Sequence, residues 1–518
     1  MPLPARRAYP LALLLGGLAA CGFAPVEAWP LTLGCLGGLT ALLKRTHSIR
    51  GAAWLGWWFG LGLFTIGNNW IATAFTYQAA MPAWLGWIAV VLLALYLALF
   101  PAVATAAAWW LARRTGGALP LLFAATWIVA EYLRATVFTG FAWNPLAAIW
   151  VPLWPLAGMV AYIGTYGLSG LTVLVAGALF AAVGALRRSL AAAPREQRRT
   201  RAIILGGMAI AIGTGLASVI VPLATLRPRE NAAGLRLRIV QPNVNQAEKW
   251  QEDFQARNYA RLVALTGRPT DEPRLVLWPE VAVPNFLEEE PGTRLRIARL
   301  LGPRDLLLTG GISLRYDAGG EAIAATNSVF GLDPRGRLLG RYDKSHLVPY
   351  GEYLPMRPIL SRLGLSRLAP GDMDFDAGPG ARDLVLPGVG PVGVQICYEI
   401  IFSGRVIDSA HRPRFLFNPS NDAWFGRWGP PQHLAQARLR AMEEAVPVIR
   451  ATPTGISAVI DTHGQLLHAL PWRTAGVIDA RLPAAAPPTP FARFGNLLPM
   501  ALALLLALIG FASRRRAS

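Results

Sequence analysis

Cysteine, histidine and charged residues are scarce in this chain. Its 518 residues include only 3 cysteines, 6 histidines and 15% charged residues. Three cysteines cannot form a disulfide framework, and the few histidines show no ligand spacing with Cys397 that would indicate a zinc site. The polar half of the chain also lacks a G-x-S-x-G motif, the usual setting of a serine-triad nucleophile. The sequence therefore argues against a disulfide-rich secreted domain, a zinc enzyme and a serine hydrolase.

Apolar residues, in contrast, make up 53% of the chain, and its mean hydropathy is +0.38. These values are too apolar for an ordinary soluble protein. The longer apolar runs reach the ~20 residues that a helix needs to cross a bilayer. The runs fall at about 9–24, 29–43, 52–74, 84–112, 117–137, 160–186, 202–222 and 495–511. The composition predicts an integral membrane protein with one sizeable polar domain.

The net charge of +19 is concentrated between the apolar runs. Basic residues crowd five short segments, where Glu196 is the only acid. These segments are 6–7, 44–50, 113–114, 187–201 and 514–516. Their distribution is a membrane-topology signal, because basic residues are enriched in cytoplasmic loops. No basic face for nucleic acid is implied, and no nucleic-acid partner is expected.

The same distribution predicts eight spans with both chain termini in the cytoplasm. Residues 1–222 would form a transmembrane domain of seven helices, 223–494 an extracytoplasmic domain, and 495–518 a last transmembrane helix with a cytoplasmic tail. The first two apolar runs are short, so a tight hairpin or a partly re-entrant pair fits them as well as two full spans. Since they count as a pair, the topology is the same in either case.

Two groups of polar residues stand inside the apolar runs. Glu131 and Arg134 are three residues apart on one predicted helix, and Asn68 and Asn69 lie near the outer end of another. Ionisable groups at membrane depth are costly, and they are usually paired or functional. An intrahelical Glu131–Arg134 pair that locks helix packing and a direct functional role both fit this pattern.

Residues from about 233 onward alternate between strand and helix patterns. Turn residues and period-two alternation predict strands at 235–239, 275–277, 306–308, 328–332, 337–342, 392–396 and 415–417, followed by three more. Helical patterns fall near 251–266, 293–301, 403–410 and 431–445. Alternation of this kind predicts a layered α/β domain.

Three chemically distinctive residues stand at the ends of these strands. Cys397 follows the strand at 392–396, Glu280 follows the strand at 275–277, and Lys344 follows the predicted hairpin. Reactive groups in open α/β sheets gather at the carboxyl ends of strands. The lysine is informative because the chain has only three lysines, so arginine supplies nearly all other positive charge. The pattern places all three side chains at one rim of the domain.

A cysteine, a lysine and a glutamate within reach of one another can carry out acyl transfer. A neighbouring ammonium lowers the pKa of a thiol. A carboxylate whose pKa is raised by burial can take the thiol proton and later return it. The ammonium can also stabilise the oxyanion of a tetrahedral intermediate. The residues therefore indicate catalysis through a thioester on Cys397, with a small core cysteine and a surface lysine as the alternatives.

The motifs around these residues resemble those of the nitrilase superfamily. Glu280 stands in Leu-Trp-Pro-Glu, Lys344 in Tyr-Asp-Lys-Ser-His-Leu-Val-Pro-Tyr-Gly-Glu, and Cys397 in Ile-Cys-Tyr-Glu. Further motifs are Ser-Asn-Asp-Ala-Trp-Phe-Gly at 420–426, Gln-His at 432–433 and the segment 241–250. With the eight apolar runs, the chain resembles the bacterial apolipoprotein N-acyltransferase family over essentially its whole length. The resemblance implies an αββα sandwich for the polar domain.

By this resemblance, Glu280 is the general base, Cys397 the acyl-carrying nucleophile and Lys344 the stabiliser of the oxyanion and the thiolate. Glu352 matches the supporting second glutamate of the family. The implied reaction moves an acyl chain from a membrane phospholipid, through the cysteine thioester, to the α-amino group of the N-terminal diacylglyceryl-cysteine of a lipoprotein. A ping-pong mechanism, no cofactor or metal, a monomer, and the bacterial inner membrane are implied with it.

Further residues match positions that are important in the family. These are Tyr398, Glu399 and Trp250, the last on a mobile loop. For Glu399, a structural salt bridge below the nucleophile fits as well as a direct catalytic role. Trp424 and Phe425 belong to an apolar surround that suits a lipid substrate, and a lid that packs on the domain is the alternative for them.

Two other functions fit parts of the sequence. A membrane-tethered nitrilase-type amidase would use the same three residues but would release acid to water. Apolar segments at 353–368 and 424–428 suit a lipid substrate, which favours the acyltransferase over the amidase. A transporter with an extracytoplasmic binding domain would need polar groups in several spans, which only the two groups around 131–134 and 68–69 supply.

Overall fold

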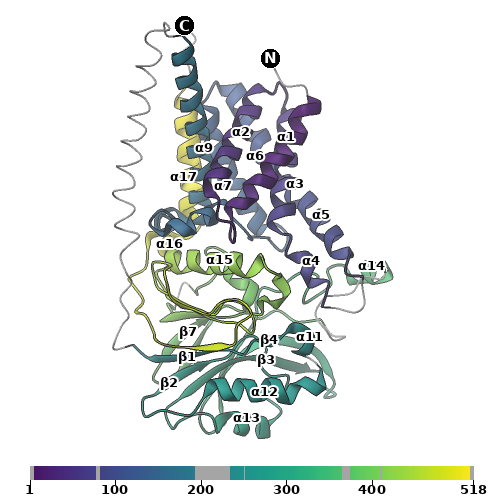
Figure 1. Ribbon diagram of the computed structural model, residues 1–518, viewed down its shortest axis with the longest axis vertical. Helices are drawn as coiled ribbons and strands as arrows, with labels where there is room; N and C mark the ends of the chain where they lie inside the picture. Colours follow the sequence, from purple (N-terminus) through teal and green to yellow (C-terminus); the bar gives the residue numbers. More distant parts are fainter. Residues whose placement is uncertain are drawn as a thin grey trace. The chain divides into compact units, whose positions relative to one another are not determined.

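The computed structural model describes residues 5–77, 82–192, 234–249, 251–363, 374–408 and 411–513. The chain divides into two compact units (Figure 1). The helical unit comprises Met1–Asn68, Val91–Arg227 and Asn496–Ser518, and the α/β unit comprises Asn69–Val90 and Pro228–Gly495. The stretch Asn69–Val90 thus belongs with the α/β unit, although it interrupts the helical unit in the sequence.

The helical unit is built from apolar helices that follow the predicted apolar runs. Its elements are α1 (Ala5–Ala19), η1 (Ala20–Gly22), α2 (Trp29–Arg45), α3 (Ile49–Gly67), α6 (Leu99–Thr115), α7 (Leu119–Thr136), η2 (Leu146–Leu153), α8 (Trp154–Ala157), α9 (Val160–Ala192) and α17 (Leu497–Ala512). Among the described residues, the helical stretches Leu85–Thr115 and Val160–Arg187 are long and apolar enough to cross a membrane. The predicted helix at 202–222 lies outside the described residues, so the eight spans stay a prediction.

Glycines let the helices of this unit approach one another closely. A Cβ added at Gly16 of α1 would lie 1.9 Å from the carbonyl oxygen of Phe59, and one added at Gly62 of α3 would lie 2.1 Å from that of Leu13. Larger residues at either glycine would therefore push α1 and α3 apart. Close backbone packing through small residues is typical of helices in membranes.

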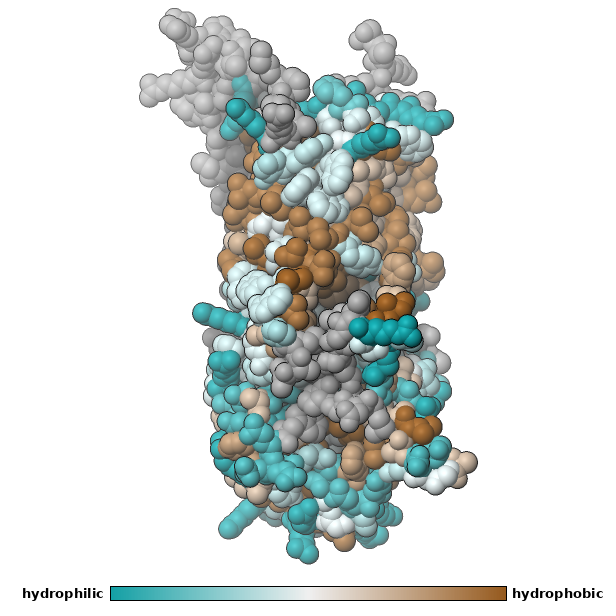
Figure 2. All heavy atoms as spheres, turned by 90° about the vertical axis from the view of Figure 1, so that its right-hand side faces the viewer, coloured by the Kyte–Doolittle hydropathy of each residue, from teal (hydrophilic) through white to brown (hydrophobic). Residues whose placement is uncertain are grey.

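Large apolar side chains face outward from the helical unit. Trp54, Leu92 and Leu505 are 50%, 60% and 52% exposed, and Figure 2 shows hydrophobic surface over this unit and mostly hydrophilic surface over the α/β unit. A contiguous apolar surface of this kind marks contact with a membrane or with another protein.

The buried polar group at Glu131 and Arg134 fastens the segment that follows α7. The Arg134 Nη1 donates to the carbonyl oxygens of Phe141 and Trp143, at 2.8 and 2.7 Å. The Glu131 Oε1 accepts from the main-chain N–H of Leu146 at 3.0 Å, whereas the two charged groups lie 3.7 Å apart. These contacts support a structural role for the pair. Both side chains, however, lie closer to the main chain of the loop that follows α7 than to each other.

The α/β unit contains two six-stranded sheets, with strand orders β12-β1-β2-β3-β4-β5 and β11-β10-β9-β8-β7-β6. The first sheet comprises β1 (Arg236–Gln241), β2 (Arg274–Leu277), β3 (Leu306–Tyr316), β4 (Ala322–Leu332), β5 (Leu338–Asp343) and β12 (Gly476–Arg481). The second comprises β6 (Asp383–Leu386), β7 (Gly390–Val394), β8 (Phe415–Pro419), β9 (Val448–Ala451), β10 (Ala458–Ile460) and β11 (Leu466–Ala469). The predicted layered α/β domain is confirmed.

Helices cover the outer faces of both sheets (Figure 1). On the first sheet, α12 (Glu252–Thr266) and α13 (Pro291–Ala298) bury Leu262 and Ile297 against Val276 and Phe330. On the second, α15 (Gly429–Glu444) packs against β9 (Val448–Ala451). The shorter helical elements of the unit are α4 (Ile71–Ala74), α5 (Leu85–Leu97, which continues into the helical unit), α11 (Gln246–Lys249), α14 (Arg357–Leu360), η3 (Ser361–Leu363), η4 (Cys397–Ile401), η5 (Asp422–Phe425) and α16 (Pro490–Phe494).

Two local predictions are wrong. No helix forms at 403–408, and 409–410 lie outside the described residues. Gly404 has φ +73°, a left-handed conformation that a right-handed helix cannot contain, and a short 3-10 turn at Cys397–Ile401 takes the place of the expected helix. After β8 there are four strands and not three, because the hairpin of β10 and β11 is made of very short strands.

Candidate active site

Glu280 leaves the end of β2 in a tightly fixed backbone. The preceding Trp278 is fully buried, and its indole N–H donates to the Thr266 hydroxyl at 2.9 Å. Across the sheet, a Cβ at Gly310 would lie only 2.7 Å from the Glu280 Cα, so the chain passes this point only because residue 310 is glycine. The motif Leu-Trp-Pro-Glu thereby sets where the Glu280 carboxylate points.

Lys344 follows β5 and is 1% exposed. Its main-chain N–H donates to Asn327 O at 2.8 Å, and its carbonyl accepts from the Gly378 N–H at 2.7 Å. Hydrogen bonds of both main-chain polar groups thus fix the point from which the side chain extends. A buried lysine held in this way is not a surface cation, which removes the alternative that the sequence left open.

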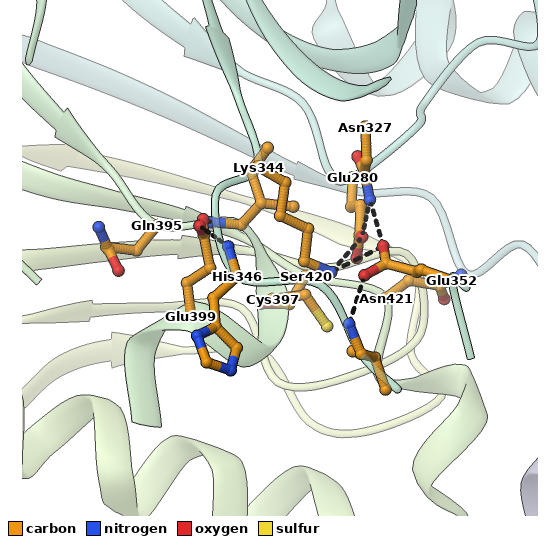
Figure 3. A network of polar contacts seen from close by, with 12 residues as sticks. Glu280, Asn327, Lys344, His346, Glu352, Gln395, Cys397, Glu399, Ser420 and Asn421 are labelled. Carbon is orange, nitrogen blue, oxygen red and sulfur yellow. Dashed lines mark hydrogen bonds and ion pairs between the residues drawn. The ribbon is translucent and has the colours of Figure 1, made fainter. Parts of the chain in front are cut away.

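Lys344 lies between two carboxylates (Figure 3). Its Nζ is 2.8 Å from Glu352 Oε1 and 3.9 Å from Glu280 Oε1. The Asn327 Nδ2 donates to the same two oxygens, at 2.7 Å to Glu280 and 3.1 Å to Glu352. The second oxygen of Glu352 accepts from the Val348 N–H at 2.9 Å. Glu352 is therefore fully engaged as a support for the ammonium.

Glu280, in contrast, keeps one oxygen free. Its Oε2 is buried and has no hydrogen-bond partner within the described parts of the chain. A buried carboxylate oxygen without a partner is costly and unusual in a native structure. Since Figure 3 places the Cys397 side chain beside this cluster, that oxygen is the atom available to receive a proton at the site.

The protonation states at the site follow from burial and charge. Burial lowers the pKa of Lys344, but the carboxylates of Glu352 and Glu280 and the Cys397 sulfur outweigh it and raise that pKa, so the side chain is an ammonium. Burial raises the pKa of Cys397 well above its usual value, Glu280 raises it further, and Lys344 only partly opposes them. Lys344 thus lowers the thiol pKa as expected, but the net shift is upward because burial and Glu280 outweigh it. The resting group is a thiol, and attack requires a base.

Glu399 connects the lysine segment to the cysteine segment through hydrogen bonds. Its Oε1 accepts from the Ser345 N–H at 2.7 Å, the His346 N–H at 3.1 Å and the Tyr342 hydroxyl at 3.0 Å. Its Oε2 accepts from the Ile396 N–H at 2.7 Å. Burial raises its pKa, against these hydrogen bonds and Lys344. No ion pair of Glu399 occurs among the described residues, so hydrogen bonds take the place of the salt bridge that was one of its two sequence-based interpretations.

The aromatic residues predicted near the substrate have different surroundings. Tyr398 is buried, with its ring 5.3 Å from that of Phe402. Phe425 is also buried and lies edge-on to Trp70 at 4.7 Å, whereas Trp424 is half-buried. Phe425 therefore packs inside the unit. Trp250 lies outside the described residues.

Lys249 is a residue of the site that the sequence reasoning missed. Its Nζ donates to the main-chain oxygen of Glu280 at 3.1 Å. Burial lowers its pKa to about 8, against Glu280 and Cys397, which raise it. Lys249 and Glu280 also line a pocket together with Asn258 and Tyr259. The scarcity of lysine was the signal that could have found it, because Lys249 is one of only three lysines in the chain.

Two six-stranded sheets with a buried cysteine, lysine and glutamate at their strand ends define an α/β unit of the carbon–nitrogen hydrolase type. The family model "Carbon-nitrogen hydrolase" matches residues 236–486, and "Apolipoprotein N-acyltransferase N-terminal domain" matches residues 15–178. Among solved structures, Nit3 of Saccharomyces cerevisiae, a member of branch 10 of the nitrilase superfamily, is 18% identical and has a TM-score of 0.34, covering 48% of this chain and 90% of its own.

Curated relatives match nearly the full length. The apolipoprotein N-acyltransferases of Rhodopseudomonas palustris and Bradyrhizobium diazoefficiens are 35% and 36% identical, each over 98% of this chain and over 95% and 94% of their own lengths. That of Caulobacter vibrioides is 36% identical over 96% of this chain and 93% of its own. The chain belongs to the apolipoprotein N-acyltransferase family, and it is an enzyme of the acyltransferase class. The family predicted from the motifs is confirmed.

Proposed function

We propose that this enzyme transfers an acyl chain from a membrane phospholipid to the α-amino group of the N-terminal diacylglyceryl-cysteine of lipoproteins, through a thioester on Cys397. The observation that carries the proposal is the unpartnered Glu280 Oε2 in a buried cluster with Lys344 and Cys397. The names of the full-length relatives support the lipoprotein substrate. The cycle uses no cofactor or metal.

In the first half-reaction, the Cys397 sulfur attacks the ester carbonyl of the phospholipid while Glu280 Oε2 takes the thiol proton. The C–S bond forms and negative charge develops on the carbonyl oxygen, where the Lys344 ammonium stabilises it. The intermediate then expels the alkoxide of the lysophospholipid, which receives the proton back from Glu280. The products are a lysophospholipid and an acyl thioester on Cys397.

In the second half-reaction, the α-amine of the acceptor attacks the thioester carbonyl. Glu280 accepts a proton from the attacking amine, the C–N bond forms, and the C–S bond breaks. The departing sulfur regains a proton from Glu280, so the enzyme returns to its resting thiol. Donor and acceptor use the same pocket in turn, which gives ping-pong kinetics.

The other predicted site residues have supporting roles in this proposal. Glu352 holds the Lys344 ammonium in place, and Glu399 joins the segments that carry the lysine and the cysteine. Tyr398 and Trp424 would border the acyl chain. Exposed apolar side chains of the segment at 353–363, Met356 at 62% and Ile359 at 59%, support entry of a lipid. We also keep Trp250 and Phe425 as proposed contributors to substrate binding.

We further propose that the chain spans the bacterial inner membrane eight times and works as a monomer. Residues 1–222 and 495–518 would hold the spans, and 223–494 would be the catalytic domain outside the cytoplasm. The distribution of basic segments and the two long apolar helices support this arrangement. Reporter fusions should place 187–201 and 514–518 in the cytoplasm, and an outside location of 187–201 would contradict the eight-span topology.

The function is tested by giving the purified enzyme a phospholipid together with a peptide that carries an N-terminal diacylglyceryl-cysteine. We expect the acyl chain to appear as an amide on the peptide, with an equal amount of lysophospholipid. A membrane-tethered amidase of the same fold would instead send the acyl chain to water. Release of free fatty acid without amide, while acceptor is present, would replace the transferase by that hydrolase.

A further inference from the structure

The main chain at Cys397 adopts a conformation that requires external support. Its φ is +51°, in the left-handed region, which is strained for a non-glycine residue and persists only where neighbours enforce it. The Cys397 carbonyl oxygen accepts two hydrogen bonds, from His433 Nε2 at 3.0 Å and from Asn418 Nδ2 at 3.4 Å. The histidine therefore provides the shorter of the two contacts at the strained residue.

His433 lies on α15 within a charged cluster that solvent does not reach. His433, Asp422 and Arg450 are each 0% exposed. The Arg450 Nη2 lies 2.5 Å from Asp422 Oδ2 and 3.0 Å from His433 Nδ1, and the same Nδ1 lies 2.9 Å from Asp422 Oδ1. The Phe425 ring covers the imidazole with ring centres 5.5 Å apart, and Trp70 covers Phe425. Such a cluster is rigid, because every charge in it has a partner.

The surroundings of the imidazole decide which nitrogen carries the proton. A carbonyl oxygen only accepts hydrogen bonds, so Nε2 must carry a hydrogen to bind Cys397 O. Burial and the Arg450 charge lower the pKa of His433 against Asp422, which keeps the ring neutral with a single N–H. The Nδ1 is then the acceptor for the Arg450 Nη2 at 3.0 Å, and the Asp422 Oδ1, 2.9 Å from the same nitrogen, receives no proton from the ring in this tautomer. The Arg450 donor and the Cys397 carbonyl thus favour the tautomer protonated on Nε2, and Asp422 contributes by holding Arg450 in place through its Oδ2.

We propose that His433 is a positioning residue for the nucleophile: its Nε2–H, directed by Arg450 and Asp422, holds the Cys397 main chain so that the sulfur faces Glu280 and Lys344. The inference rests on the proposed role of Cys397 as nucleophile. It assigns a role to Asp422 and His433, which belong to the motifs at 420–426 and 432–433 but take no part in the proposed proton transfers. Phe425 acts here by keeping water from the imidazole.

Two substitutions separate positioning from general packing. In His433→Gln the side-chain NH2 extends about as far as the imidazole Nε2 and can still donate to Cys397 O, whereas in His433→Asn it ends near the Nδ1 position. We expect His433→Asn to form the acyl-enzyme about 10- to 100-fold more slowly, with an unchanged KM for phospholipid, because a small misplacement of a reacting atom has effects of this size. His433→Gln should recover most of the wild-type rate.

Gln436→Met is the matched control, because Gln436 is buried on the same helix and donates to the main-chain oxygen of Gln432. It should lower the melting temperature about as the His433 variants do but leave the acylation rate unchanged. An equal rate for His433→Asn and wild type, or an equal loss in the Asn and Gln variants, would overturn the inference. If wild-type Cys397 itself takes up no acyl chain, the proposed function fails instead.

A measurement on the wild-type protein covers the case in which the variants do not fold. In protein labelled with ¹⁵N-histidine, His433 is expected as a neutral ring protonated on Nε2 at neutral pH. A neutral ring protonated only on Nδ1, which has no hydrogen to give to the Cys397 carbonyl, would overturn the inference.

Discussion

Replacing Glu280 by glutamine is expected to slow acyl-enzyme formation by about 10²- to 10⁴-fold, the range that a positioned general base contributes. The amide keeps the volume of the side chain, and its oxygen can still accept from Asn327. It cannot take the thiol proton, and the resting Cys397 is a thiol because burial and Glu280 both raise its pKa. The rate of the acyl adduct on Cys397 in a single turnover with phospholipid measures the effect.

The same variant should slow acylation and yet make the Cys397 thiol easier to ionise. Since the Glu280 charge raises the pKa of Cys397, its removal should lower that pKa, and alkylation by a small thiol reagent should begin at lower pH. Glu280→Gln would then have a more easily ionised thiol and yet acylate more slowly. Glu272→Gln, the same change at an exposed glutamate, is the control and should leave both rates unchanged. Acylation at the wild-type rate in Glu280→Gln would contradict the general-base role.

Lys344→Arg should lose about 10²- to 10³-fold in kcat although it keeps the positive charge, as expected when an oxyanion donor is removed. Lys344 is 1% exposed, and its Nζ lies 2.8 Å from Glu352, so the site has no room for a planar guanidinium. The larger group would also displace Glu280, whose Oε1 lies 3.9 Å from the ammonium. Steady-state acyl transfer to an acceptor peptide measures the loss.

Lys44→Arg is the matched control, since it makes the same change at an exposed lysine of α2, and it should not alter kcat. Lys344→Met separates size from charge, because it approximates the volume and removes the ammonium. We expect it to be at least as impaired as Lys344→Arg. Near-normal kcat in Lys344→Arg would mean that a point charge at this position is not needed.

The positions of the three central residues could be predicted from the sequence, because each follows a short strand. Strand patterns at 275–277, 337–342 and 392–396 end just before Glu280, Lys344 and Cys397, and the folded chain brings these side chains together. Local alternation of side chains is sufficient for such a prediction, since the carboxyl ends of strands gather at one rim. Residues that support the site from mid-strand or mid-helix carry no comparable signal.

The roles of Asn327 and His433 could not be predicted from the sequence. Asn327 lies within β4, and in the sequence its amide looks like that of any polar strand residue. Its contact with two glutamates depends on the register of β4 beside β5, which the sequence pattern does not show. The direction of the Cys397 pKa shift also required the fold, because burial and the Lys344 charge act in opposite directions and only the packed site decides between them. The helix expected at 403–410 does not form over 403–408, where Gly404 has a left-handed backbone conformation that the sequence does not reveal.

In the proposed cycle Cys397 carries the acyl chain between the two substrates, and the intact mass of the enzyme after incubation with phospholipid alone reveals whether it does. We expect a gain of one acyl chain, located on Cys397 by peptide mapping, with release of one lysophospholipid and loss of the adduct when the acceptor peptide is added. Cys397→Ser should show no thioester. An unchanged mass of the wild-type enzyme, or an acyl adduct that peptide mapping places on a residue other than Cys397, would contradict the proposed cycle.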